Sequence, residues 1–249
     1  MYITTLFKKS WNAQTQYVLE LILSNIQIFL QGITSFVVGL YANATLDIYT
    51  QQQLLYYYIF GVGFLLFFTR NNMARDFGDM VVAGNIVPHL LRPYTYIIFY
   101  LWHNLSTLIY RALTTLALYI IVSILFFDLS IHLMILLRAL IIIPIALFYI
   151  YCVHAFFCLL SFVFERIDQL AHIIFMVAFF AGGGLVPVSM YPSVFLYLPT
   201  SFLYYHPLHM IISGDMQFAL LAATYVGGMF IATFTLYHVT KRYIQVHGG

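Results

Sequence analysis

The sequence predicts an all-α, polytopic integral membrane protein with six transmembrane helices. Of its 249 residues, 63% are hydrophobic and only 7% are charged, whereas a soluble domain carries about 25% charged residues. Apolar runs of about 20 residues, the length that crosses a bilayer as a helix, recur from end to end. We therefore expect one membrane domain over residues 1–249, with no soluble catalytic domain. The predicted spans cover residues 20–42, 52–69, 96–127, 133–160, 169–187 and 217–240.

Basic residues predict the orientation, because Lys and Arg accumulate in cytoplasmic loops. Eight of the ten basic residues fall on one side of the six-span arrangement, and the three segments on the other side contain none. Both termini are therefore expected to be cytoplasmic. The eight residues are Lys8, Lys9, Arg70, Arg75, Arg92, Arg166, Lys241 and Arg242.

The other two basic residues, Arg111 and Arg138, fall within the third and fourth predicted spans. A charge at the centre of a membrane helix costs about 2.5 to 3.5 kcal/mol on insertion scales, so each arginine needs a role. One interpretation is anchoring, with the side chain reaching toward the membrane surface. The other is that the arginines line a polar route through the membrane.

A line of polar residues runs along the first span at steps of four and three, which places them on one face of a helix. Polar groups in hydrocarbon need partners. This face is therefore expected to meet another helix, a second subunit or a water-filled route. The residues are Glu20, Ser24, Gln27, Gln31 and Thr34.

Residues 1–19 precede the first span and are too polar for a signal peptide. Their apolar positions, Ile3, Leu6, Phe7 and Trp11, recur at helical spacing. This pattern predicts a short interfacial helix along the inner leaflet, and the alternative is a disordered lead-in.

Residues 70–93 separate the second and third spans and mix charged with apolar side chains. The pattern predicts a cytoplasmic amphipathic helix that stops at Gly84, before Pro93 turns the chain into the third span. A mixed surface of this kind favours a protein docking site, with Phe77 as its apolar anchor. The alternative is a loop that only caps the bundle.

Residues 182–214 join the last two spans and are almost uncharged, yet they cannot form one continuous helix. They predict a broken or re-entrant pair of short helices in the outer leaflet. The alternative is a loop that lies flat on the membrane surface. The residues that interrupt the helix are Gly182, Gly183, Gly184, Pro187, Pro192, Pro199 and Pro207.

Motifs for enzyme chemistry are missing from the sequence. It contains no P-loop, no G-x-S-x-G and no H-E-x-x-H pattern. His206 and His209 have no acidic neighbour before Asp215, and Cys152 and Cys158 stand six apart in one apolar run. We therefore expect neither a metal site nor a disulfide, and the sparse charge argues against nucleic-acid binding.

Two segments resemble the ABC-2-type export permeases. The first is AGNIVPHLLRPYTYIIFYL, with Gly84, Leu90, Leu91, Arg92 and Pro93, which is similar to the cytoplasmic motif ahead of their third span. The second, GGGLVPVSMYPSVFLYLPTSFLYYHPLHMIISGD, is similar to their region between spans five and six, although it is unusually aromatic. Length, span number and cytoplasmic termini extend the resemblance over nearly the whole chain.

The resemblance implies the transmembrane subunit of an ATP-driven exporter in the bacterial plasma membrane. Two permease subunits, identical or related, would pair around a central route above two P-loop nucleotide-binding subunits. ATP and Mg would be bound by those partner ATPases, so this chain would hold no cofactor and would not itself be an enzyme. The substrate class stays open among polysaccharides, lipids, drugs and peptides.

The resemblance also assigns roles to residues. The implied coupling element between permease and ATPase contains Arg75, Asp76, Phe77, Asp79, Gly84, Leu90, Arg92 and Pro93. Residues expected at the translocation pathway or subunit interface are Gln27, Gln31, Thr34, Arg111 and Arg138. A self-contained secondary transporter or channel is the main alternative, and a membrane-embedded enzyme is a third.

Overall fold

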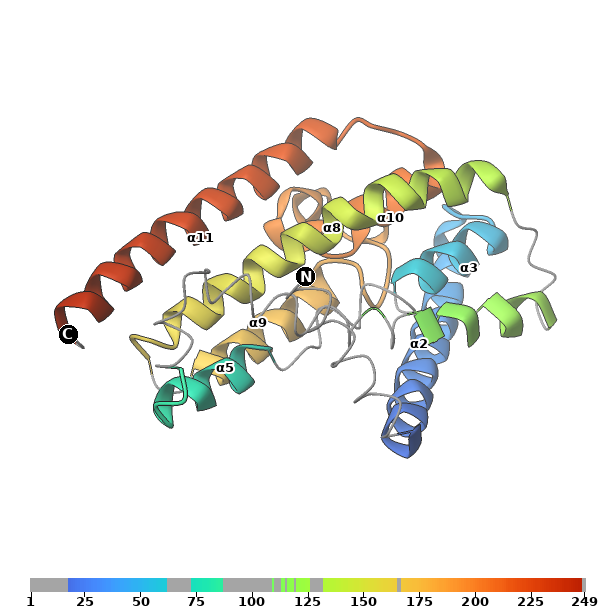
Figure 1. The fold of residues 1–249 in the computed structure, drawn as a ribbon. Helices are drawn as coiled ribbons and strands as arrows, with labels where there is room; N and C mark the ends of the chain where they lie inside the picture. Colours follow the sequence, from blue (N-terminus) through green and yellow to red (C-terminus); the bar gives the residue numbers. More distant parts are fainter. Residues whose placement is uncertain are drawn as a thin grey trace.

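The computed structural model describes residues 18–61, 73–86, 109, 113–114, 116–118, 120–125, 132–164 and 167–247. These residues form helices and connecting turns without any strand, as the all-α prediction requires (Figure 1). The elements are α2 (Val18–Leu46), α3 (Gln51–Phe60), α5 (Met73–Val82), α8 (Leu133–Leu160), α9 (Ile167–Ala181), η2 (Val188–Met190), η3 (Ser193–Tyr197), η4 (Pro199–Phe202), α10 (Tyr205–Ser213) and α11 (Ala219–His247).

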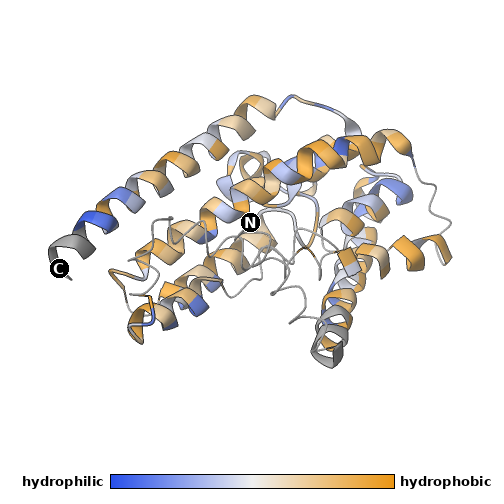
Figure 2. Cartoon of the chain, viewed as in Figure 1, coloured by the Kyte–Doolittle hydropathy of each residue, from blue (hydrophilic) through white to orange (hydrophobic). Residues whose placement is uncertain are grey.

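Three helices of the described part are long and apolar enough to cross a membrane. They are Ile26–Leu46 within α2, Leu133–Leu160, which is the whole of α8, and Ala219–Arg242 within α11. They coincide with the first, fourth and sixth predicted spans. Figure 2 shows apolar residues along α8 and a polar C-terminal end of α11. The six-span arrangement as a whole stays a prediction.

The helix bounds correct several of the predicted ones. The fifth span, predicted over 169–187, is too long, because α9 ends at Ala181 where Gly183 takes a left-handed φ of +98°. Helix α11 continues to His247, beyond the predicted end of the sixth span, while its candidate membrane-crossing part, Ala219–Arg242, agrees with the prediction. The interfacial segment lies outside the described residues up to position 17.

Helices α8 and α11 run side by side for most of their length (Figure 1). The hydroxyl of Thr233 on α11 donates a hydrogen bond to the backbone oxygen of Cys152 on α8, at 3.0 Å. Thr233 and Thr240 are among the few buried polar residues of α11. The remaining exposed face of α11 is largely apolar, as a membrane helix facing lipid requires.

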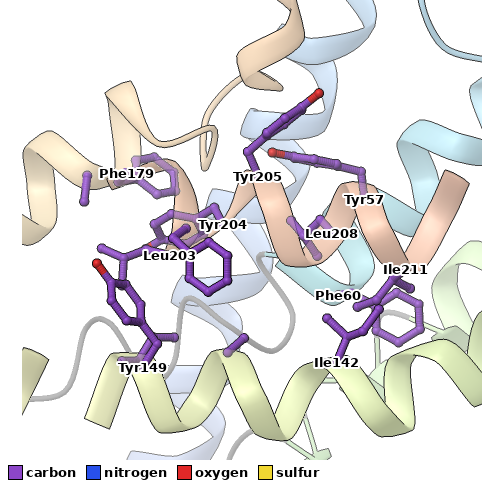
Figure 3. Close-up of a cluster of buried hydrophobic side chains, with 14 of the residues drawn as sticks. Tyr57, Phe60, Ile142, Tyr149, Phe179, Leu203, Tyr204, Tyr205, Leu208 and Ile211 are labelled. Atoms are coloured by element: carbon purple, nitrogen blue, oxygen red, sulfur yellow. The ribbon is translucent and has the colours of Figure 1, made fainter. Parts of the chain in front are cut away.

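Helix α3 packs against α2 and α10. A capping box starts it, in which the hydroxyl of Thr50 accepts from the Gln53 amide and the Gln53 side chain accepts from the Thr50 amide. All seven residues from Leu54 to Phe60 are buried. Figure 3 shows Tyr57 and Phe60 from this helix in the same cluster as Leu208 and Ile211 of α10.

We predict that Gly183→Ala lowers the stability of the purified protein. The left-handed backbone costs a residue other than glycine about 1 to 2 kcal/mol, and the new methyl group would lie 2.7 Å from the Tyr57 hydroxyl. The matched control is Gly228→Ala in α11, where no atom lies within 4 Å of the added carbon. Thermal unfolding in detergent should show a lower Tm for the first variant only. Equal Tm values would contradict the tight contact.

Candidate functional site

Helix α5 packs one face against the rest of the chain. Its buried residues, Met73, Ala74, Phe77 and Gly78, recur at helical spacing. They face the turn between α8 and α9, where the ring of Phe77 meets the ring of Phe162 edge to face at a centroid distance of 5.7 Å. The α5 helix is therefore fixed to the two helices that meet at this turn.

The opposite face of α5 is open and charged. Arg75, Asp76 and Asp79 are exposed, and Val82 is 70% exposed. Gly84 follows in a left-handed conformation with φ of +72°, which turns the chain back. As a result, Ile86 is buried in the same cluster of side chains as Phe77. The predicted stop at Gly84 thus has the geometry of a helix C-cap.

Phe77 does not play the part that the sequence indicated. It was expected to anchor a partner protein, but only 1% of its surface is exposed because its own chain covers it. An amphipathic pattern predicts that a face is buried without specifying which molecule buries it. The face left for a partner consists of Arg75, Asp76, Asp79 and Val82.

The charges on this face influence one another. Partial burial raises the pKa of the Asp76 carboxyl above its ordinary value, and the nearby Asp79 raises it further. Arg75 acts in the opposite direction and lowers the same pKa. A cationic group brought by a partner would therefore stabilise the ionised form of Asp76.

Three of the other expected coupling residues, Leu90, Arg92 and Pro93, lie outside the described residues. The same holds for Arg111 in the third predicted span. Their roles stay predictions.

The polar stripe of α2 turns away from the core that α2 forms with α3. Gln27 and Thr34 are exposed and Gln31 is half-buried, while Ser35 and Phe36 lie on the buried face. The Thr34 hydroxyl donates to the backbone oxygen of Leu30 at 2.9 Å. The side chains of Glu20 and Ser24 lie outside the described part. A second subunit or a water-filled route thus fits the described stripe better than packing against α3.

Arg138 lies in the second turn of α8, against the end of α10. A carbon added to Gly214 would stand 2.5 Å from the guanidinium carbon of Arg138. Gly214 is the left-handed C-cap of α10, and a cation is favourable near the C-terminal carbonyls of a helix. This position agrees with the anchoring interpretation of Arg138.

Residues 182–214 form several short elements instead of one helix. Pro187 and Pro192 precede η2 and η3, Pro199 starts η4 and Pro207 lies in the first turn of α10. The expected pair of short helices is thus replaced by three 3-10 turns and one α-helix. Gly182 and Gly184 are needed for close approach, because added carbons would collide with the Thr200 backbone oxygen and the Phe179 ring.

Sequence reasoning missed the tyrosines that hold residues 182–214, the predicted outer segment. The hydroxyls of Tyr57 and Tyr58 on α3 donate to the backbone oxygens of Gly183 and Leu185, at 2.7 and 2.8 Å. The hydroxyl of Tyr49 lies 2.8 Å from that of Ser189. Consecutive tyrosines in an apolar span were the available signal, since a buried hydroxyl needs a hydrogen-bond partner.

The two outer histidines take part in local packing. A ring nitrogen of His206, Nε2, lies 2.7 Å from the Leu196 backbone oxygen, which joins α10 to η3. His209 Nδ1 lies 3.3 Å from the Ser213 hydroxyl. Within the described ranges, no group of three or more His, Cys, Asp or Glu residues is arranged to hold a metal ion.

Residues 28–246 match the family model described as ABC-2 family transporter protein. The chain belongs to this family. A match over nearly the whole chain confirms the resemblance that the two motifs suggested. No curated protein and no solved structure matches the chain.

Membership makes the chain a membrane permease of an ABC transporter, which is a transport component. ABC-2 family membrane proteins work with ATPase partners. In this ABC-2 family transporter protein, α5 is a described helix that joins a buried apolar face to an open charged one.

We predict that Phe77→Ala destabilises the ABC-2 permease even when no partner is present. Truncating a buried Phe costs about 3 to 5 kcal/mol, because a cavity remains beside Phe162. Val82→Ala on the same helix is the control, since exposed substitutions stay within about 0.5 kcal/mol. Thermal unfolding of the purified variants measures both. A wild-type Tm for Phe77→Ala would contradict the packing of α5.

Proposed function

We propose that this permease is the export subunit of an ATP-driven transporter and that a separate nucleotide-binding subunit docks on the exposed face of α5. The single observation that carries the proposal is the division of α5 into two faces. Its apolar face is occupied by the chain itself, and Arg75, Asp76, Asp79 and Val82 stay open. Charges orient a docking partner, and an exposed apolar residue among them provides contact area.

The packing of α5 supports a role in transmitting movement. The helix contacts both α8 and α9, the two helices that meet at its buried face. A partner that displaced α5 would act on α8 through Phe77 and on α9 through the contacts that α5 makes with that helix. Helix α8 continues to the opposite end of the molecule, whereas α9 is shorter and leads into residues 182–214 (Figure 1). Contiguous packing of this kind is a physical route for coupling two ends of a protein.

The positions of the basic residues support a cytoplasmic location of α5. Leu236 and Tyr237 of α11 pack on the same cluster as Phe77, so the C-terminal end of α11 lies beside α5. Lys241 and Arg242 follow within two turns and are exposed. With Arg75, they gather basic residues at one end of the molecule, as expected of the cytoplasmic side of the bacterial plasma membrane.

The described stripe of α2 supports pairing with a second permease subunit, identical or related. Gln27 faces away from the core, and its amide would be costly against lipid tails. A second copy of the stripe offers amide and hydroxyl partners in hydrocarbon. The same stripe could line a route between the two subunits, so the interface and the pathway coincide in this arrangement.

We predict that charge reversal on α5 weakens ATPase binding. The combined variant Arg75→Glu, Asp79→Lys inverts both ends of the exposed charge pattern, and each exposed charge contributes about 0 to 1 kcal/mol. Affinity-tagged permease should therefore retain several-fold less of the P-loop ATPase that co-purifies with the wild type, and less ATP hydrolysis.

The control is Lys241→Glu, an equally exposed basic residue on α11. This variant should retain wild-type amounts of ATPase. Equal retention by the α5 variant would rule out α5 as the docking face. A wild-type permease that transports without any ATPase would instead favour a secondary transporter or channel.

A further inference from the structure

Tyrosine hydroxyls satisfy the backbone where α9 ends. After Ala181 the chain leaves the helix, so its carbonyl oxygens lose their partners in the following turn. The oxygen of Gly182 accepts from the Tyr205 amide at 3.1 Å. Two further carbonyl oxygens, those of Gly183 and Leu185, accept from the hydroxyls of Tyr57 and Tyr58 on α3. The end of α9 is thus attached to a different helix by side-chain hydrogen bonds.

A glycine makes room for each of these two tyrosines. The Tyr57 hydroxyl lies where a carbon on Gly183 would approach to 2.7 Å. The Tyr58 ring crosses α2 at Gly39, where an added carbon would overlap its hydroxyl and ring. The position of the Tyr57 hydroxyl therefore depends on Gly183 in the segment that it holds. The position of the Tyr58 hydroxyl depends on Gly39 in α2. Figure 3 shows the Tyr57 hydroxyl directed toward Tyr205, beside the start of α10.

Each of the hydrogen bonds from Tyr57 and Tyr58 is either formed or broken, with few intermediate arrangements. Tyr57 and Tyr58 are buried, so a hydroxyl that leaves its carbonyl must find another partner or reach water. A net protein hydrogen bond is weak enough to exchange during a functional cycle. Two such bonds between separate helices form a connection that can open without unfolding either helix.

The two ends of α9 face different parts of the molecule. Its first turns pack near α5, and its last residue leads into the glycines that the α3 tyrosines hold. A shift of α5 that carried α9 along its axis would move the Gly183 and Leu185 oxygens past the tyrosine hydroxyls. The hydrogen bonds from Tyr57 and Tyr58 would then respond to a movement at the opposite end of α9.

We propose that Tyr57 and Tyr58 are positioning residues of the transport cycle, whose hydroxyls latch the end of α9 to α3 until movement of α5 releases them. This inference rests on the proposed function, because the ATPase supplies the movement. The latch itself can be tested without nucleotide, so the two claims can fail separately.

The experiment uses the permease with its ATPase in lipid nanodiscs, where both faces are accessible. The only reactive thiol is Met190→Cys in η2, half-buried beside the latch, in a background with Cys152→Ala and Cys158→Ser. Labelling by a maleimide is measured without nucleotide and after trapping with ATP and vanadate. In the otherwise unaltered chain, labelling should be slow without nucleotide and at least about fivefold faster when trapped, the change that the loss of one ordinary hydrogen bond gives.

The combined variant Tyr57→Phe, Tyr58→Phe should label fast without nucleotide and gain little from trapping. Gly39→Ala, which displaces the Tyr58 ring but keeps its hydroxyl, should shift labelling in the same direction. Tyr56→Phe is the matched control, since its hydroxyl accepts from the His132 amide at 3.0 Å, at the start of α8. This control should behave as the unaltered chain does.

Slow labelling and a full response to trapping in the double variant would overturn the latch. So would labelling of Ala155→Cys, buried in α8, in the double variant, because the hydroxyls would then only maintain the fold. If the double variant labels fast but trapping has no effect on the unaltered chain, the claim that the tyrosines attach the end of α9 to α3 is upheld. That result would contradict the ATP-driven release and the proposed function.

Discussion

Phe77 packs edge to face against Phe162, and this contact decides which side of α5 faces away from the chain. Because Phe77 is buried, the apolar face of α5 packs against the turn between α8 and α9. The charged face is not buried by the chain, and the packed apolar face holds it in position. A docking element that passes movement to the membrane helices needs both properties, because a loosely held helix would move without its neighbours.

A second constraint acts at the far end of α9. Apolar surroundings offer no water to a backbone that leaves its helix, so every freed carbonyl oxygen needs a partner within the protein. The glycines at 182–184 create this demand, and tyrosines from α3 meet it. The helix that starts near α5 thus ends in bonds that belong to another helix. The permease is fixed at both ends of α9 by interactions of different kinds, apolar packing at one and hydroxyl bonds at the other.

Composition and local signals predict the parts of this fold that depend on neighbouring residues. The bounds of α8 follow from a long apolar run that only a few polar residues such as Arg138 interrupt, and the C-cap of α5 follows from Gly84. What the sequence could not provide is the choice of partner. An amphipathic helix buries its apolar face in either its own chain or another one, so Phe77 was assigned to the wrong molecule. The acceptors of Tyr57 and Tyr58 lie about 126 positions away in the chain, beyond any local pattern.

The central claim, that the ATPase docks on the open face of α5, is tested most directly by photo-crosslinking. A photoreactive side chain at Val82, which is 70% exposed, should join the permease to a P-loop ATPase subunit on irradiation of native membranes. The same group at Met73, which is 3% exposed on the buried face, should give no such product. ATPase products from an exposed position of the outer segment such as Val194, with none from Val82, would contradict the account.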